Sequence, residues 1–385
     1  MTAAALPLEG IRVLDLSRLL PGPFATLVLA DMGAAVDKLE DLDAGDYLRH
    51  MPPKHGDDSA MFLVLNRNKR SLGLDLKKPE GKAAFLRLLQ GYDVLVDQFR
   101  PGVLARLGLS HDDLLAAHPR LVICALTGYG QTGPHARRAG HDLNYLARAG
   151  LLGAQGPHDG VPAVPGYQLA DVGGALWAAV GILAALHERT RTQRGSVVDI
   201  SMMDAAMGFG ISNLGQLFGG QAQTRGAMAL TGGIAPYRTY RTKDERFVAL
   251  AALEPKFWIA FCAAVGLEAD LGALMPGPHQ AALMSAIENI FSQRTLAEWT
   301  AFAQQHDVCL EPVLEPHELE ADAQVVARGL MFPLGGMTHL RLPTTPQRRQ
   351  HSEPPKRGEH TDDILREAGF SDEERAALRA SGAAR

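Results

Sequence analysis

The sequence predicts an α/β protein with a mostly parallel sheet, followed by a smaller α+β region. In the first part of the chain, short apolar segments alternate with segments of helical length. This alternation is typical of strand–helix–strand units, in which the strands pair in parallel. Farther along, apolar segments at residues 237–241 and 247–251 flank a charged turn at residues 243–245. That pattern predicts a hairpin, and the helical segments after it predict a second domain.

The elements of the first region follow from local signals in the sequence. Apolar segments bounded by turn residues predict strands at residues 11–16, 35–40, 71–76, 93–99 and 121–126. A helix is expected at residues 23–32, where Gly33 ends it, and another at residues 79–90, where Pro79 occupies the first turn. Ser110 and Asp113 have the spacing of a capping box and predict a short helix to about residue 117.

A long apolar helix is expected at residues 172–189. Its apolar side chains leave almost no polar face, so the sequence predicts that the helix is buried; they are Leu176, Trp177, Val180, Ile182, Leu183 and Leu186. The uninterrupted apolar run is shorter than the roughly 20 residues that a membrane-spanning helix needs. No membrane helix is therefore expected here.

The remaining chain contains a loop, a strand and several helices. A segment rich in Gly and Pro at residues 153–166 predicts a loop. A strand is expected at residues 197–202, and one helix from residue 203 to Gly219-Gly220. The expected later helices lie at residues 255–265, 280–291 and 295–305, with a last one capped by Ser371 and Glu374.

Composition narrows the class of protein. The chain has 385 residues, of which 46% are hydrophobic and 21% charged, as in an ordinary soluble protein. A net charge of −5 argues against non-specific binding of nucleic acid. Three cysteines, far apart, fit neither a zinc site nor a redox motif and indicate a reducing compartment. Residues 1–7 lack the features of a signal peptide, and residues 382–385 are not a peroxisomal signal, so a cytoplasmic location is expected.

One glycine motif points to dinucleotide binding only superficially. Residues 128–133 match G-x-G-x-x-G and follow a predicted strand. The dinucleotide motif requires a helix directly afterwards, whereas Pro134 and a segment without amphipathic pattern follow here. We therefore expect no NAD or FAD site, and no metal site or other cofactor.

A histidine and an aspartate are the candidate acid/base groups. His141 lies in a turn-like stretch and Asp171 at the start of the long apolar helix. Side chains of these types can exchange protons at neutral pH. The helix dipole is expected to favour the charged form of Asp171, and the N–H groups of Gly173 and Gly174 are candidates for an oxyanion site. The alternatives are that Asp171 is only a helix N-cap and His141 only a loop residue.

A set of short motifs, taken in their order along the chain, resembles the class III CoA-transferase superfamily. Within that superfamily, it resembles the α-methylacyl-CoA racemases most. The motifs carrying the resemblance are residues 8–16, 21–24, 66–77, 99–103, 127–134, 140–142, 170–174, 252–255 and 358–362. The resemblance implies a Rossmann-like large domain, a small domain and a dimer of interlocked ring-like chains. With the local signals, it implies a large domain at residues 1–190, a connection at 191–224, a small domain at 225–330 and a C-terminal segment at 331–385 that returns to the large domain.

The resemblance also implies two chemistries that use the same aspartate. In the transferases the residue at Asp171 attacks the thioester and forms covalent intermediates. In the racemases it exchanges a proton with the α-carbon of a 2-methylacyl-CoA, with a histidine and a glutamate that match His141 and Glu254. Transferases more typically carry Tyr or Phe at position 141 and Asn-Asp at positions 254–255, so a racemase is favoured. The alternatives are a CoA-transferase and a catalytically silent CoA-binding protein of the same fold.

CoA contacts are carried over from the same resemblance, residue by residue. The resemblance implies contacts with the adenine end of CoA at Leu74, Asp75, Leu76 and Lys77, and a basic contact at Arg106. It implies that the pantetheine path is lined by Gln98, Phe99, Arg100, Gly140, Asp142, Leu143, Asn144 and Tyr145. One position departs from the family pattern, because Asp41 replaces the usual phosphate-binding Arg. An acid there repels phosphate, so Lys38, Arg49 or Arg70 is expected to take over. The residues 231–237 combine racemase-like glycines with a transferase-like Ile234.

Overall fold

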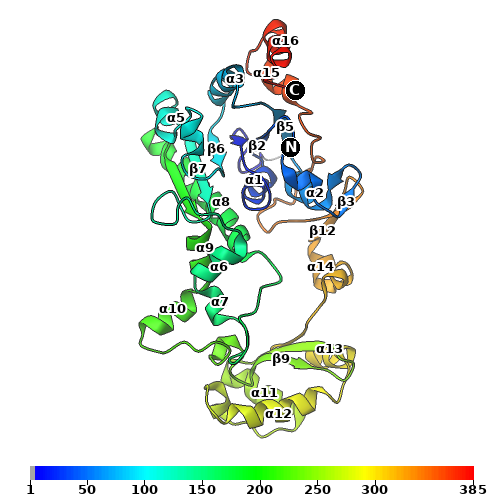
Figure 1. Ribbon diagram of the computed structural model, residues 1–385. Coiled ribbons are helices and arrows are strands. Elements are labelled where there is room, and N and C mark those ends of the chain that lie inside the picture. The colour runs from blue at the N-terminus through cyan, green and yellow to red at the C-terminus, as the bar shows by residue number, and fades with distance from the viewer. Residues whose placement is uncertain (1–4) are drawn as a thin grey trace. The chain divides into compact units, whose positions relative to one another are not determined.

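The computed structural model describes residues 5–385, which form two compact units (Figure 1). The first unit contains the chain up to Ala149, Tyr167–Gly208 and Gln324–Arg385. The second contains Gly150–Gly166 and Phe209–Ala323. Residues 1–4, which include most of the stretch considered for a signal peptide, lie outside the described residues.

A six-stranded parallel sheet is the framework of the first unit. The strand order is β5-β2-β1-β6-β7-β8, and every neighbouring pair is parallel. The strands are β1 (Arg12–Asp15), β2 (Ala35–Glu40), β5 (Lys69–Gly73), β6 (Val94–Asp97), β7 (Val122–Thr127) and β8 (Val197–Ser201). All six residues of β7 are buried, as expected for a strand that is covered on both faces. The predicted parallel α/β fold is confirmed, although β5 begins and ends earlier than residues 71–76.

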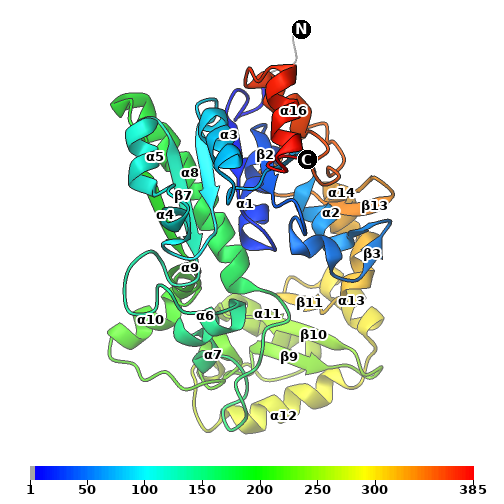
Figure 2. The ribbon, with the colours of Figure 1, turned by 45° about the horizontal axis from the view of Figure 1, so that its top comes forward.

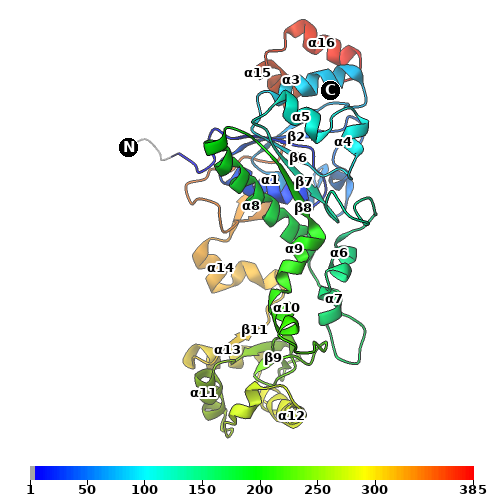
Figure 3. The same ribbon diagram turned by 90° about the vertical axis from the view of Figure 1, so that its left-hand side faces the viewer.

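Helices cover both faces of this sheet (Figure 3). On one face, α1 (Pro21–Asp31) packs against α8 (Leu169–Thr192), which also contacts β7 and β8. On the other face, apolar side chains of five helices share one core with the strands. Those helices are α3 (Pro79–Leu89), α4 (Val103–Arg106), α5 (His111–Ala117), α15 (Thr361–Glu367) and α16 (Asp372–Ala380). The Ser110 cap of α5 and the Ser371 cap of α16 form as predicted.

Residues near the C-terminal end of the sequence pack beside strands that come much earlier in the sequence (Figure 2). Asp75 donates its N–H to the carbonyl of Ala383, and Leu74 forms a bridge with Ala384. The short elements of the first unit complete the list: β3 (Lys54–His55), β4 (Asp58–Ser59), a 3-10 helix (Tyr47–His50), α2 (Ala60–Asn66), α6 (Asp142–Arg148), α9 (Met202–Phe209), α14 (Ala323–Arg328), β12 (Met331–Leu334) and β13 (Met337–Leu340).

Helix α8 differs from its prediction in length and in burial. It begins at Leu169 rather than residue 172 and has 24 residues, so by length and apolar composition it could cross a membrane. The expectation that its apolar run is too short was wrong. Complete burial was also wrong, because Leu176, Trp177 and Val180 are 44%, 51% and 54% exposed. The opposite side of α8 packs in the first unit against α1 and the sheet, as a core helix does.

The second unit has a three-stranded antiparallel sheet covered by helices. The predicted hairpin forms between β9 (Tyr237–Arg241) and β10 (Phe247–Ala251), and β11 (Leu310–Pro312) joins it. Its core is aromatic, with Trp258, Phe261, Phe291 and Trp299 buried together. The helices are α7 (Leu151–Ala154), α10 (Ile211–Phe218), α11 (Pro255–Val265), α12 (Gln280–Phe291) and α13 (Leu296–Gln305), with 3-10 turns at Ala229–Thr231, Leu271–Leu274 and Pro316–Ala321. The single helix expected from residue 203 is instead divided into α9 and α10 at Gly210.

Candidate active site

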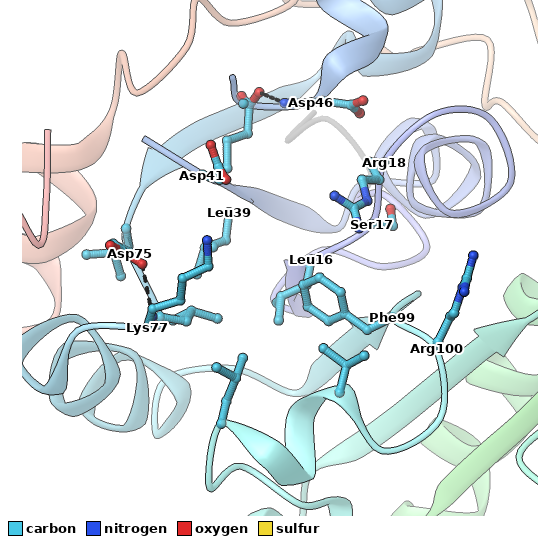
Figure 4. A pocket seen from close by; sticks show the side chains of 16 residues that line it. Leu16, Ser17, Arg18, Leu39, Asp41, Asp46, Asp75, Lys77, Phe99 and Arg100 are labelled. Carbon is cyan, nitrogen blue, oxygen red and sulfur yellow. Dashed lines mark hydrogen bonds between the residues drawn. The ribbon is translucent and has the colours of Figure 1, made fainter. Parts of the chain in front are cut away.

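Two neighbouring cavities lie in the first unit where the parallel strands end. Loops after the carboxyl ends of parallel strands commonly form ligand sites in such sheets. The first cavity has a volume of about 550 Å³ and follows β1, β2, β5 and β6 (Figure 4). The second has a volume of about 350 Å³ and follows β6 and β7. Arg18 and Arg100 line both cavities, so the two adjoin each other.

The first cavity contains most of the residues expected to contact the adenine end of CoA. Leu74, Asp75, Leu76 and Lys77 form one wall, in the loop that follows β5. Phe99 and Arg100 lie opposite, in the loop after β6. Arg106, at the end of α4, does not line either cavity. The loop that presents Leu74 and Asp75 is held by Ala383 and Ala384, so a distant part of the chain shapes this wall.

The three cations that were expected to replace the usual phosphate-binding Arg are all occupied elsewhere. Lys38 is fully buried and pairs with Asp46 at 3.0 Å. Arg49 is buried between Glu40 and Asp58. Arg70 pairs with Asp37 and Glu367. Since each guanidinium or ammonium group already has carboxylate partners, the expectation that one of them binds phosphate was wrong.

Other cations face the first cavity. Arg18 and Lys77 lie on opposite sides of it, and Arg100 lies at its boundary with the second cavity (Figure 4). All three side chains are exposed, and within residues 5–385 none of them forms an ion pair. Our sequence reasoning missed Arg18, although its place just after the first strand is a detectable signal. Its guanidinium lies over the rings of Tyr47 and Phe99, at 5.3 and 5.6 Å from their centroids.

Asp41 also lines the first cavity, where its side chain stabilises the loop that follows β2. Its Oδ1 accepts hydrogen bonds from the N–H groups of Asp43 and Ala44 at 3.0 and 2.9 Å. These bonds hold the pKa of the carboxyl below its usual value, so Asp41 remains charged at neutral pH. Asp41 therefore stabilises a turn and places a negative charge beside the three cations.

The second cavity brings His141 and Asp171 together. His141 is the N-cap residue of α6, and Asp171 is the third residue of α8. Both line this cavity, as do Gln98, Gly140 and Tyr145. The prediction that both groups lie where a loop enters a helix is confirmed. Neither Leu143 nor Asn144 reaches the cavity: Leu143 is exposed, and the side chain of Asn144 accepts a hydrogen bond from the N–H of His141.

Asp171 is not a helix cap, because another carboxylate occupies that position. Oδ1 of Asp142 accepts hydrogen bonds from the N–H groups of Ala170 at 2.7 Å and Asp171 at 3.1 Å. The N-cap residue of α8, Gln168, makes no side-chain capping bond. Asp142, expected as a CoA contact, therefore caps α8 from the neighbouring helix. The alternative that Asp171 is only an N-cap was wrong.

The expected oxyanion site at Gly173 and Gly174 was also wrong. Only the first four N–H groups of a helix lack partners within it, whereas these glycines are the fifth and sixth residues of α8. Both are buried. A Cβ atom on Gly174 would lie 2.7 Å from Cγ of Met202. Gly174 thus allows α8 to pack closely against α9.

The surroundings of Asp171 raise its pKa, whereas the helix start was expected to favour its charged form. Burial, together with the nearby charge of Asp142, raises the pKa of Asp171 to about 7. Desolvation disfavours the charged carboxylate, and a second carboxylate disfavours it further. The helix start was expected to favour the charged form of Asp171, but burial and the charge of Asp142 outweigh that effect. A carboxyl with this pKa can both accept and donate a proton near neutral pH.

Tyr145 shapes the cavity through two glycines. Its hydroxyl donates a hydrogen bond of 2.6 Å to the carbonyl of Gly140, the residue before His141. A Cβ atom on Gly128 or Gly140 would lie 2.4 or 2.7 Å from the tyrosine ring. The glycines of residues 128–133 thus permit close packing, and no helix follows them in residues 128–141. This agrees with the interpretation that the motif is not a dinucleotide site.

Glu254 lies in the second unit. It is exposed and is the N-cap residue of α11, without a side-chain capping bond. Its pairing with His141, which lies in the first unit, stays a prediction. No group of three or more potential metal ligands occurs among the described residues.

Comparison with known proteins identifies the family to which this site belongs. The model of CoA-transferase family III matches residues 8–361. The chain belongs to CoA-transferase family III. The mouse α-methylacyl-CoA racemase is 37% identical to this family III protein over 384 residues, which cover 95% of this chain and 94% of that one. The predicted membership of the superfamily is confirmed.

Other relatives of this family III protein have a different activity. The mouse succinyl-CoA:glutarate CoA-transferase is 31% identical over 382 residues, covering 95% of this chain and 87% of that one. A crystal structure of a CAIB/BAIF family protein from Brucella suis superposes with a TM-score of 0.83 at 29% identity, covering 94% of this chain and 99% of that one. The family and fold are thus shown, while racemase and transferase relatives are similarly distant.

Proposed function

We propose that this protein inverts the α-carbon of a 2-methylacyl-CoA thioester by proton transfer through an enolate. His141 and Asp171 are the two acid/base groups, and each removes the α-proton from one face of the substrate. The other group then returns a proton to the opposite face. Glu254 orients His141. This reaction needs no cofactor, because CoA enters as part of the substrate.

One observation carries this proposal: a single cavity is lined by a histidine and by an aspartic acid whose pKa is raised to about 7. Efficient acid/base groups have pKa values near the working pH, because they must be readily protonated and readily deprotonated. Burial and Asp142 give Asp171 this property. A carboxyl with an ordinary pKa would be a poor proton donor at pH 7.

The CoA part of the substrate is assigned to the first cavity. Its adenine end contacts Leu74–Lys77, and Arg18, Lys77 and Arg100 bind the phosphates. Arg18 and Arg100 line both cavities, which supports a path from the nucleotide to the thioester. Guanidinium and ammonium groups without carboxylate partners are well suited to phosphate oxygens.

The alternative is transfer of CoA between carboxylic acids. In that reaction the Asp171 carboxylate attacks the thioester carbonyl, CoA leaves as its thiolate, and an aspartyl anhydride remains. The observation in its favour is the similarity to transferases along nearly the whole chain. His141 favours the racemase, because the resemblance implies Tyr or Phe at this position in a transferase.

Deuterium exchange separates the two reactions. A 2-methylacyl-CoA is incubated with the protein in heavy water, without a second carboxylic acid, and deuterium at the α-carbon is measured by mass spectrometry. We expect exchange together with loss of configuration. The same incubation with succinate or glutarate tests for transfer. Formation of succinyl-CoA or glutaryl-CoA with release of the free 2-methyl acid, without α-exchange, would replace the racemase by the transferase. Absence of both exchange and transfer would indicate a CoA-binding protein without catalysis.

A further inference from the structure

One carboxylate connects the two proposed acid/base groups. Asp142 is the first residue of α6 and directly follows His141. Its Oδ1 accepts hydrogen bonds from the N–H groups of Ala170 and Asp171 in the first turn of α8. These N–H groups have no partner within their own helix, so the bonds both satisfy them and fix the start of α8. The backbones that carry His141 and Asp171 are therefore fastened to each other at one point.

We propose that Asp142 is a positioning residue of the active site, which holds Asp171 in place against the helix that begins at His141. This inference rests on the proposed function for its effect on activity. Substrate inversion requires two groups in fixed positions on opposite faces of one carbon, and displacement by about 1 Å can cost roughly 10²-fold in rate. A bond from one helix to the backbone of the other limits this displacement.

The same carboxylate also acts through its charge. After burial, Asp142 is the next cause of the raised pKa of Asp171. The other ionisable groups that line the cavity with Asp171 are His141, Tyr145, Tyr47, Arg18, Arg100 and Arg138. Asp142 differs from these groups because its side chain bonds to the backbone N–H of Asp171. Asp142 thus contributes both to the position of Asp171 and, after burial, to its raised pKa.

Two substitutions separate position from charge. Asp142→Asn keeps an oxygen acceptor at Oδ1 but removes the charge. Asp142→Glu keeps the charge but moves the carboxylate away from the two N–H groups. Because a neighbouring negative charge raises the pKa of Asp171, its removal must lower that pKa. We expect the rise of the deprotonation rate with pH to move to lower pH by on the order of one unit in Asp142→Asn.

In Asp142→Glu we expect the pH dependence to stay the same and the rate to fall. The pH at which the rate rises stays near that of the unchanged protein, while kcat falls by roughly 10²-fold with little change in KM for the thioester. Thr295→Ala is the control, because Thr295 caps α13 in the second unit and lines neither cavity. It should alter thermal stability without altering the pH profile.

A direct titration keeps the test independent of the reaction. The full-length protein is labelled with ¹³C at aspartate carboxyls, and the Asp171 signal is identified by its loss in Asp171→Asn. We expect its midpoint near pH 7, and a lower midpoint in Asp142→Asn. An unchanged midpoint, or an unchanged kcat in Asp142→Glu, would overturn the proposal for Asp142. Absence of α-exchange in the unchanged protein would instead overturn the proposed function, while the titration would still decide the role of Asp142.

Discussion

Asp171 keeps its carboxyl free for chemistry because Asp142 already bonds the backbone donors at the start of α8. Two side chains of the same type therefore have different roles. Asp142 is held by N–H groups, whereas Asp171 is partly buried near another negative charge and its pKa rises to about 7. Pairs of carboxyl groups whose surroundings drive their proton affinities apart are typical of acid/base sites.

Substitution of the two proposed bases should affect the two substrate enantiomers differently. Asp171→Asn removes the group that deprotonates one enantiomer, so its α-exchange should be strongly reduced, while His141 still exchanges the other. His141→Ala should show the opposite preference. Inversion requires both groups and should fall by about 10²–10⁴-fold in either variant. Exchange in heavy water is measured separately for the 2R and 2S thioesters, and equal losses for both would argue against two opposed bases.

Asp41 should weaken CoA binding through its charge. It lines the first cavity together with Arg18, Lys77 and Arg100. Asp41→Asn keeps the oxygen that bonds the loop N–H groups but removes the charge, so CoA affinity should increase by roughly 2- to 5-fold at low salt. Calorimetry measures this change. Asp43→Asn is the matched control, since Asp43 lies on the same loop outside the cavity; an equal effect of both would place the phosphates elsewhere.

At the scale of elements, α8 depends on glycines that let it approach the sheet. Gly181 faces β8, and a Cβ atom there would lie 2.6 Å from Cγ1 of Val198. We expect Gly181→Ala to destabilise the protein by about 1–3 kcal/mol, because the helix or the strand must move. Gly153→Ala is the control, since no atom lies within 4 Å of the added Cβ. Denaturant unfolding measures both; equal stability of the two variants would contradict this packing role.

The elements that could be predicted from the sequence are those set by nearby residues. The order of strands and helices, the Ser110 and Ser371 caps and the hairpin of β9 and β10 all follow from local patterns. The start of α8 could not be predicted, because its cap comes from Asp142 in another helix. Nor could the occupied state of Lys38, Arg49 and Arg70, whose partners are brought together by folding.

At the scale of the whole molecule, one face of α8 is both apolar and exposed to solvent. Leu176, Trp177 and Val180 lie on this face, and their exposure is unusual for the middle of so apolar a helix. Contiguous apolar surface on a soluble protein commonly marks an interaction site. Together with the family resemblance, this leads us to propose a homodimer of interlocked chains, in which the second unit of one chain supplies Glu254 to the site of the other.

Sedimentation tests the dimer directly. We expect a single species of twice the chain mass at micromolar concentration, and dissociation only under conditions that also unfold the protein. Trp177→Glu places a charge on the exposed face of α8 and should weaken the assembly, or lower its yield, if that face is covered by the partner. A stable folded monomer of the unchanged protein would contradict this prediction.

The contact between Asp75 and Ala383 has a consequence for how the protein is made. A ribosome synthesises the loop at Leu74–Lys77 long before the segment that supports it, since the nearby bond from Lys78 to Ser381 joins residues 303 positions apart. During most of translation, this wall of the first cavity therefore lacks its support. If the first cavity binds CoA as proposed, nascent chains should acquire this affinity only after residues 381–384 have been made, and the ligand cannot assist the earlier folding of the sheet.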